Sequence, residues 1–259
     1  MASVQELLRR GDTLSSDSPR RDVEILLGYC LGKSRSWLYT WPDNEVDPAA
    51  AAHFEALVQR RAGGEPVAHL TGQRDFWSLS LAVDGSTLIP RPETETLVAW
   101  ALELALPADA EVLDLGTGTG AIALALASER ADWRITGVDI SEGAVELARR
   151  NAAAAGLEAT CFRVSDWFAG LDLHKYHLVV SNPPYIDAVD PHLEQGDLRF
   201  EPRSALVAGD KGLADLALIV RASPSHLLPG GWLLLEHGFE QGAAVRNLLH
   251  EHGFTCVET

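Results

Sequence analysis

The sequence of 259 residues contains few cysteines and no long hydrophobic run. Its three cysteines, Cys30, Cys161 and Cys256, lie far apart and form no Cys-x-x-Cys pair. This spacing indicates neither a disulfide framework nor a zinc knuckle, and a reducing compartment fits it best. Glu6 and Arg9 interrupt the amino terminus, so no signal peptide is indicated, and no apolar stretch approaches the length of a membrane helix. We therefore expect a soluble cytoplasmic protein.

Positive charge is also scarce. The chain has 21 Lys and Arg against 37 Asp and Glu, which gives a formal net charge of −16. Non-specific binding to nucleic acid requires Lys and Arg that neutralise phosphates, so this balance argues against it. Arg20, Arg21, Arg60 and Arg61 could still form a small positive patch for a protein partner. The hydrophobic content of 46% is typical of a soluble globular protein, and the length suffices for one large or two modest domains.

The first 75 residues have the pattern of a helical domain. Pro19 stands in the first turn of one predicted helix, and Gly32 ends that helix. Pro48 opens a second helix in the same way, and Gly63 closes it.

From residue 76 the hydrophobic period changes to two. Apolar residues alternate with small or polar ones at Trp77, Leu79, Leu81 and Val83. The turn signal Asp84-Gly85 follows, and after it comes the short segment 87–89. We predict a β-hairpin over residues 76–90 that links two domains.

After the hairpin, helices alternate with short apolar strands, which indicates a parallel sheet covered on both faces. Helices are expected at about 93–106 and at 141–155, the second of them capped by Ser141 and stopped by Gly156. Strand candidates are 111–115, 135–139, 159–164, 176–181, 232–236 and 254–258. The last of these would be an uncovered sheet edge, which leaves open whether the carboxyl terminus is truncated.

A glycine-rich loop from Asp114 to Ala121 follows a predicted strand and opens a helix. Its glycines let the backbone approach a ligand where a side chain would intrude. Gly116, Gly118 and Ala121 satisfy the dinucleotide fingerprint, and Asp139 lies near the expected distance for an acidic contact to ribose. An NAD-dependent dehydrogenase is therefore one candidate.

The charge of Asp114 favours a different ligand. A carboxylate directly before the glycines would repel a pyrophosphate and attract a cationic ligand without phosphates. S-adenosylmethionine carries both a sulfonium and an ammonium group, and Asp139 suits its ribose equally well. After the next predicted strand, Asp166 and Trp167 could border the adenine through a hydrogen bond and an apolar wall. Core packing explains Trp167 about as well.

The tetrapeptide Asn182-Pro183-Pro184-Tyr185 follows the apolar run 176–181. The carboxyl end of a parallel strand is where open α/β sheets place their chemistry. Two prolines stiffen the loop, and its free carbonyl oxygens and the Asn182 side chain are acceptors suited to an NH2 group. Tyr185 offers a flat face to a planar partner, such as an amide or an aromatic amine. An ordinary turn is the alternative explanation.

Two other motifs have structural explanations. Pro92, Glu93 and Glu95 are good residues for the first turn of a helix and need no function there. His174 and His177 have the spacing of metal ligands, but no third ligand is evident. We assign no metal site.

Together these motifs resemble the release-factor glutamine methyltransferases. That family N5-methylates the glutamine of the Gly-Gly-Gln motif in class I peptide chain release factors. The Pro-Arg-Pro-Glu-Thr-Glu segment and the helical amino-terminal part are specific to it, whereas the glycine loop and Asn-Pro-Pro-Tyr also occur in other methyltransferases. The likeness spans nearly the whole chain and rests on residues 18–22, 64–72, 88–95, 114–120, 182–185 and 200–206.

The resemblance implies a helical substrate-recognition domain over 1–75, a β-hairpin linker over 76–90 and a Rossmann-like class I methyltransferase domain over 91–259. It assigns S-adenosylmethionine binding to Gly116, Thr117, Gly118, Thr119, Gly120, Asp139, Trp167 and Asn182. It also assigns substrate binding and catalysis to the tetrapeptide: Asn182 and the Pro183 carbonyl accept from the target NH2, and Tyr185 packs on its plane beside Pro184. Family members continue into a last hairpin strand that this chain lacks.

Two alternatives remain at this stage. An adenine-N6 DNA methyltransferase would present the same flat NH2 to the same loop, although the negative charge disfavours it and no basic DNA-reading domain is recognisable. A non-catalytic nucleotide-binding module would keep the fold without turnover, but the complete glycine loop and tetrapeptide argue against it. A release factor is therefore the expected partner, without stable binding to nucleic acid or to a membrane.

Overall fold

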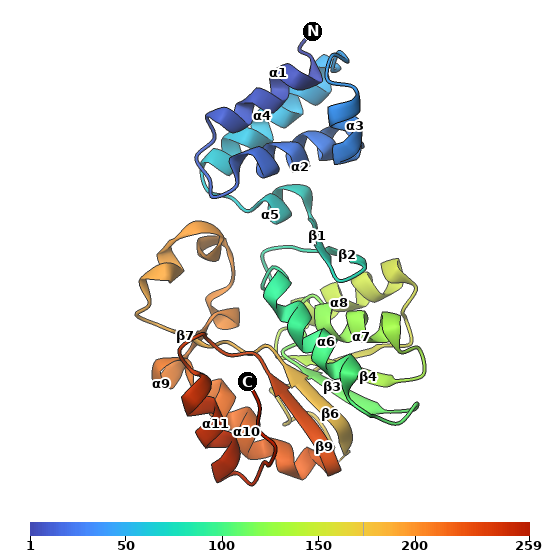
Figure 1. Cartoon of the computed structure of the whole chain (residues 1–259), viewed down its shortest axis with the longest axis vertical. Coiled ribbons are helices and arrows are strands. Elements are labelled where there is room, and N and C mark those ends of the chain that lie inside the picture. Colours follow the sequence, from blue (N-terminus) through green and yellow to red (C-terminus); the bar gives the residue numbers. More distant parts are fainter. Residues whose placement is uncertain (173) are drawn as a thin grey trace. The chain divides into compact units, whose positions relative to one another are not determined.

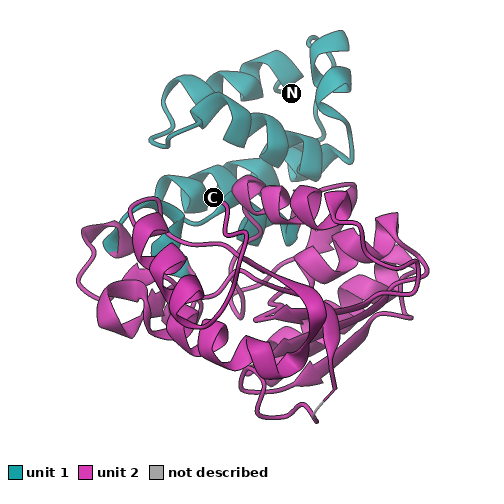
Figure 2. Ribbon diagram, turned by 60° about the horizontal axis from the view of Figure 1, so that its bottom comes forward, with its two compact units in different colours: residues 1–73, 194–200 teal, residues 74–193, 201–259 magenta. Residues whose placement is uncertain are grey.

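The computed structural model describes residues 1–172 and 174–259. The chain forms two compact units, one of residues 1–73 with 194–200 and the other of residues 74–193 with 201–259 (Figure 2). The segment 194–200 therefore belongs to the first unit although it follows most of the second unit in sequence. Among the described residues, none of the helices has both the length and the apolar character needed to span a membrane.

The first unit is helical (Figure 1). Its helices are α1 (Val4–Leu8), α2 (Pro19–Leu31), α3 (Arg35–Thr40), α4 (Pro48–Ala62) and α5 (Val67–Thr71), with a 3-10 turn at Arg9–Asp12. Both predicted helices are confirmed. Gly32 ends α2 in the left-handed conformation, and the Asp47 carboxylate caps α4 by accepting from the backbone of Ala49 and Ala50. Buried apolar side chains such as Phe54, Leu26 and Leu38 form the core between the helices.

The predicted positive patch in this unit is wrong for one of its four arginines, Arg61. Arg61 is buried, and its guanidinium lies 2.7 Å from Asp22 Oδ2 and 2.9 Å from Asp197 Oδ1. The Arg60 guanidinium pairs with the Glu65 carboxylate, with Nε 2.8 Å from Oε2. A buried guanidinium needs carboxylate partners, so Arg61 holds the unit together rather than presenting positive charge. Through Asp197, Arg61 also ties the segment 194–200 to the helices.

The hairpin exists, but its turn lies earlier than predicted. Strands β1 (Gln73–Phe76) and β2 (Leu79–Ala82) pair across two residues, whereas 87–89 forms no strand. The turn depends on Trp77, which takes φ 55. Its backbone N–H donates to Glu95 Oε1 at 2.9 Å, and its indole N–H donates to Glu129 Oε1 at 2.7 Å. These tertiary bonds stabilise a conformation that local sequence disfavours for tryptophan, and so they shift the turn.

The second unit is built on a parallel sheet of five strands in the order β5-β4-β3-β6-β9. Its strands are β3 (Glu111–Leu115), β4 (Arg134–Asp139), β5 (Cys161–Val164), β6 (Tyr176–Ser181) and β9 (Leu227–Leu235). Its main helices are α6 (Glu95–Glu103), α7 (Ala121–Glu129), α8 (Glu142–Ala155), α10 (Ala214–His226) and α11 (Gly242–Glu251). All five predicted internal strands are confirmed.

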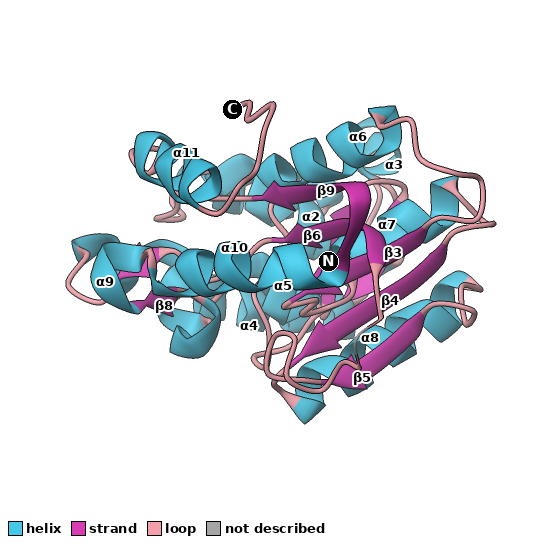
Figure 3. Ribbon diagram, turned by 90° about the horizontal axis from the view of Figure 1, so that it is seen from below, coloured by secondary structure: helices cyan, strands magenta, loops and turns pink. Residues whose placement is uncertain are grey.

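Helices cover both faces of the sheet (Figure 3). On one face α6, α7 and α8 pack on strand residues such as Val112 and Val180, and on the other α10 packs on Leu113 and Val179. Alternate residues of one strand are thus buried in opposite cores, so the sequence of each of these strands is a continuous apolar run.

The chain between β6 and α10 is irregular. It contains the short parallel pair β7 (Ile186–Asp187) and β8 (Val207–Ala208) and the short helix α9 (Gly209–Gly212). Three short 3-10 turns lie between β7 and β8: Pro191–Glu194, Gly196–Phe200 and Arg203–Ala205. Another 3-10 turn, Pro92–Thr94, lies before α6.

The prediction of a last strand at 254–258 is wrong. Phe254 packs against the core on the α10 face, and the residues after it have no strand structure. The Arg246 guanidinium of α11 donates to Thr259 Oγ1 at 2.6 Å, so the end of the chain turns back onto that helix.

Candidate active site

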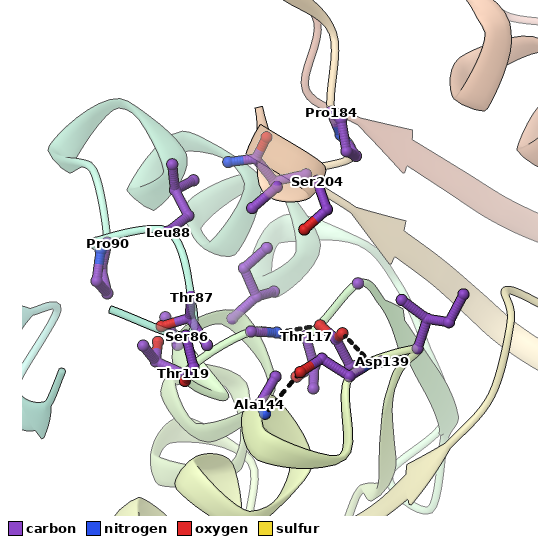
Figure 4. Close-up of a pocket in the computed structure, with 18 of the residues that line it drawn as sticks. Ser86, Thr87, Leu88, Pro90, Thr117, Thr119, Asp139, Ala144, Pro184 and Ser204 are labelled. Atoms are coloured by element: carbon purple, nitrogen blue, oxygen red, sulfur yellow. Dashed lines mark hydrogen bonds between the residues drawn. The ribbon is translucent and has the colours of Figure 1, made fainter. Parts of the chain in front are cut away.

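A cavity of about 450 Å³ opens at the carboxyl ends of the central strands of the second unit. Its lining includes residues that directly follow β3, β4, β5 and β6. In Figure 4 the 86–90 segment, Thr117 with Asp139, and Pro184 with Ser204 approach the cavity from three sides. This is the position at which open parallel sheets bind ligands.

The glycine loop forms one wall of the cavity. Gly116, Gly118 and Gly120 have φ of 69°, 54° and 83°, a region that other residues rarely adopt. Gly116 through Thr119 line the cavity. Gly120 does not line it but faces the interior of the unit, where a Cβ on this residue would lie 3.1–3.2 Å from the side chains of Leu124, Ala148 and Phe162. Gly120 therefore allows α7 to begin close to α8 and β5, while the loop before it faces the cavity.

Asp114 supports this loop from behind. Its side chain is fully buried, and its Oδ2 accepts from Thr117 Oγ1 at 2.6 Å and from the Ala123 N–H at 3.3 Å. Burial raises its pKa to about 7, and its Oδ1 has no hydrogen-bond partner among the described residues. The expectation that Asp114 presents its charge to a ligand is wrong, because the side chain is absent from the lining of the cavity. It orders the loop and the first turn of α7 instead.

Asp139 connects two parts of the cavity wall. It ends β4, and its Oδ2 accepts from the Gly118 N–H at 3.0 Å while its Oδ1 accepts from the Ser141 N–H at 2.9 Å (Figure 4). Burial raises the pKa of this carboxyl. The two hydrogen bonds fix its oxygens at the rim between the glycine loop and α8, where it lines the cavity.

Trp167 forms a flat wall beside the glycine loop. It takes φ 46, and its ring lies 3.4 Å from the position that a Cβ on Gly116 would occupy. The Asp215 carboxyl lies near the Trp167 side chain, and burial raises its pKa. Trp167, Asp166 and Asp215 all line the cavity, so Trp167 is more than a core residue.

The tetrapeptide is divided between the cavity and its surroundings. Asn182 and Pro184 line the cavity, whereas Pro183 is buried and Tyr185 lies outside the lining. The Tyr185 hydroxyl donates to Glu236 Oε1 at 3.0 Å, and its backbone carbonyl accepts from Gln241 Nε2 at 2.9 Å. Burial and the neighbouring Glu236 carboxylate raise the pKa of Tyr185. The structure therefore brings Asn182 to the same cavity as the glycine loop, Asp139 and Trp167.

The chain matches two family models, the PrmC N-terminal domain over residues 4–72 and the methyltransferase small domain over residues 94–196. A release factor glutamine methyltransferase from Pseudomonas aeruginosa is 53% identical over 259 residues, covering 100% of this chain and 94% of that protein. One from Shewanella oneidensis is 54% identical over 245 residues, covering 95% and 86%. The chain belongs to the release factor glutamine methyltransferase family.

The fold agrees with that membership. A methyltransferase from Pyrococcus furiosus superposes with a TM-score of 0.53 at 16% identity, covering 78% of this chain and 87% of that one. The second unit is thus a Rossmann-like methyltransferase domain, and the helical part before it matches the amino-terminal domain of the family.

Sequence reasoning missed several lining residues of this family member. They lie between β2 and α6, or between β7 and the first turn of α10. These residues are Ser86, Thr87, Leu88, Pro90, Arg91, Thr94, Ser204, Ala205, Val207 and Asp215. Arg91 Nη2 lies 2.7 Å and 2.8 Å from the two oxygens of Glu201, whose side chain is fully buried. This pair joins the two segments across 110 residues of sequence. The segments 88–95 and 200–206 carried the family resemblance, and that resemblance favoured 91–95 as a segment that also covers the active site, without a role for any one side chain.

The two histidines with metal-like spacing have other partners. His177 Nδ1 accepts from the Glu111 N–H at 3.0 Å, and His174 Nε2 lies 3.3 Å from Glu111 Oε2. Both side chains therefore support the start of β3, at the opposite end of the strand from the glycine loop.

Proposed function

We propose that the protein transfers the methyl group of S-adenosylmethionine to the side-chain amide nitrogen of the glutamine in the Gly-Gly-Gln motif of class I release factors. One observation carries the proposal. The amide of Asn182 lines the same cavity as the glycine loop and Asp139, in a chain more than half identical over its length to a release factor glutamine methyltransferase. Methylation of a factor used in translation implies a cytoplasmic enzyme.

The lining residues fit S-adenosylmethionine, which supplies a methyl group activated by a sulfonium. Thr87 is 2% exposed and its Oγ1 lacks a hydrogen-bond partner among the described residues, so a polar ligand in the cavity would satisfy it. We assign the glycine loop, from Gly116 to Thr119, to the close backbone approach, with Gly120 allowing the turn into α7. Asp139 would accept from the ribose hydroxyls, and Trp167 would lie along the adenine.

The charges around the cavity favour this ligand over a dinucleotide. Asp139, Asp166 and Asp215 line the cavity, and they suit a ligand with a sulfonium and an ammonium group. Among the described lining residues the one guanidinium is that of Arg91, and it is held by Glu201. A pyrophosphate would therefore meet carboxylates without a free positive partner.

The tetrapeptide would bind and orient the target amide. An amide nitrogen is a poor nucleophile because its lone pair is delocalised into the carbonyl. We assign Asn182 and the Pro183 carbonyl as acceptors for its two N–H bonds, with Pro184 and Tyr185 beside its plane. This arrangement would hold the nitrogen in line with the methyl group and favour the positive charge that develops on it. The nitrogen–carbon bond forms as the sulfur–carbon bond breaks, sulfur keeps the electron pair, and the nitrogen then releases one proton to solvent.

A labelling experiment tests the proposed function. Radiolabelled S-adenosylmethionine is offered with a class I release factor, with the same factor carrying Gln→Ala in its Gly-Gly-Gln motif, and with duplex DNA. We expect label on the intact factor and neither on the variant factor nor on DNA. Label on DNA would favour the adenine-N6 alternative, and label on the Gln→Ala factor would refute the assigned acceptor atom.

A further inference from the structure

Asn182 and Glu236 occupy equivalent positions on neighbouring strands. Asn182 is the first residue after β6 and Glu236 the first after β9, and these strands pair in parallel with Ser181 opposite Leu235. The Glu236 N–H donates to the Ser181 carbonyl at 3.0 Å, which fixes both loop starts side by side. Thr94, at the end of the 3-10 turn before α6, lies between the two side chains and is 4% exposed.

These side chains form a chain of hydrogen bonds with a defined direction. Thr94 Oγ1 donates to Glu236 Oε2 at 2.7 Å, because an ionised carboxylate can only accept. The hydroxyl has a single hydrogen, so toward Asn182 it can only accept. The atom of Asn182 that lies 3.1 Å from Thr94 Oγ1 must therefore be the donor Nδ2. The amide oxygen of Asn182 is then left for the cavity, which Asn182 lines.

The other oxygen of Glu236 is occupied as well. It accepts from the Tyr185 hydroxyl at 3.0 Å, so one carboxylate holds the side chains of Thr94 and Tyr185 together. With both of its oxygens engaged, Glu236 has a fixed orientation, and this in turn fixes the hydrogen of Thr94. The carboxylate controls Asn182 although it contributes no atom to the lining of the cavity.

We propose that Glu236 and Thr94 are positioning residues that determine which end of the Asn182 amide faces the methyl acceptor. The inference rests on the proposed function, since it matters only if the acceptor is an NH2 group. With the amide oxygen toward the cavity, Asn182 accepts from that NH2. With the amide reversed, its own NH2 would meet the NH2 of the acceptor, and two donors cannot bond. The network thus selects an acceptor that donates, as a glutamine side chain does.

Thr94→Val tests this inference because valine keeps the shape of threonine and removes the hydroxyl. We expect kcat for methylation of the release factor to fall about 10-fold, because the amide is no longer held in one orientation. The dissociation constant for S-adenosylmethionine should stay within about 2-fold of the parent value, since Thr94 holds Asn182 rather than the loop. Thr94→Ser restores the hydroxyl and should recover most of the lost kcat. Thr96→Val, at an exposed position two residues further on, is the matched control and should not change kcat.

Glu236→Gln provides a second test that does not depend on how well Thr94→Val folds. A glutamine can donate to Thr94, which would let Thr94 donate to Asn182 and reverse its amide, so kcat should fall while cofactor affinity is kept. Parent-like kcat in both Thr94→Val and Glu236→Gln would overturn the inference, and so would a loss of cofactor affinity that matches the loss of kcat. If the parent protein itself does not label the release factor, the proposed function fails, and this outcome is distinct from an active parent with equally active variants.

Discussion

Each unit of the protein contains a buried polar network that joins distant segments, but the two networks differ in what they border. In the helical unit, Arg61 bridges Asp22 of α2 and Asp197 of the segment 194–200, and none of the three lines a described cavity. In the methyltransferase unit, Glu236 bridges Thr94 and Tyr185 and lies one hydrogen bond behind a lining residue. The first network should therefore govern folding and the second turnover.

The largest effect is expected at the point where the second network reaches the cavity. Asn182→Ala removes the proposed acceptor for the target N–H, and we expect kcat to fall by about 10²-fold or more, as for the loss of a preorganised group that stabilises developing charge. The S-adenosylmethionine dissociation constant, measured by calorimetry, should change much less. Near-normal turnover would remove Asn182 from the reaction.

A substitution in the network of the helical unit should lower stability and leave kcat unchanged. Arg61→Met leaves Asp22, which is 4% exposed, without its ion partner, and removing one member of a buried pair costs about 3 kcal/mol. We expect the free energy of unfolding in urea to fall by about that amount, while kcat at saturating release factor stays near the parent value. Arg60→Met is the control: its side chain is 54% exposed, so the loss of its pair with Glu65 should cost under about 1 kcal/mol. A drop in kcat without a drop in stability for Arg61→Met would contradict the division between the two networks.

Asp114 extends the comparison between the two networks, because it is a buried acid that has no cationic partner among the residues the structure describes. Its pKa of about 7 in the folded protein lies above its value in the unfolded chain, so the folded state binds the extra proton between about pH 4 and 7. The contribution of Asp114 to stability is thus fully present below that window and is lost progressively as pH rises across it and through 7, by up to about 1.4 kcal/mol per pH unit. Asp114→Asn mimics the protonated form and should lack this slope. Urea unfolding of both proteins from pH 4 to 8 measures it, and parallel curves would show that Asp114 is not the titrating group.

The sequence predicted the layers of the molecule better than its polar contacts. The runs 111–115 and 176–181 enter two cores on opposite sides of the sheet, so their hydrophobicity alone indicates strands. The hairpin turn was misplaced because Trp77 is held by Glu95 and Glu129, which lie 18 and 52 residues away. No local pattern encodes such bonds.

The lack of any local pattern for long-range contacts also explains which residues of the site could be predicted from the sequence. Gly116 and Asn182 directly follow strand ends and Asp139 is the last residue of β4, so motif and topology agree there, and all three line the cavity. The bond between Thr94 and Glu236 spans 142 residues. Thr94 lies in the Pro-Arg-Pro-Glu-Thr-Glu segment, but no local pattern pairs that segment with Glu236. Contacts of this kind become visible only once β6 and β9 are aligned.

Thr87→Val should give the smallest effect and separates ligand binding from stability at one side chain. The Thr87 hydroxyl is buried without a partner among the described residues, so replacing it by a methyl group removes an unsatisfied polar atom from the free protein. We expect the melting temperature without ligand to stay the same or rise slightly. If the hydroxyl bonds to the cofactor, the S-adenosylmethionine dissociation constant should rise about 5-fold, as for the loss of one hydrogen bond of about 1 kcal/mol. Calorimetric titration measures this change, with Thr96→Val as the control. An unchanged dissociation constant would mean that Thr87 contacts the second substrate or none, and it would leave Asp139 and the glycine loop as the polar contacts of the cofactor.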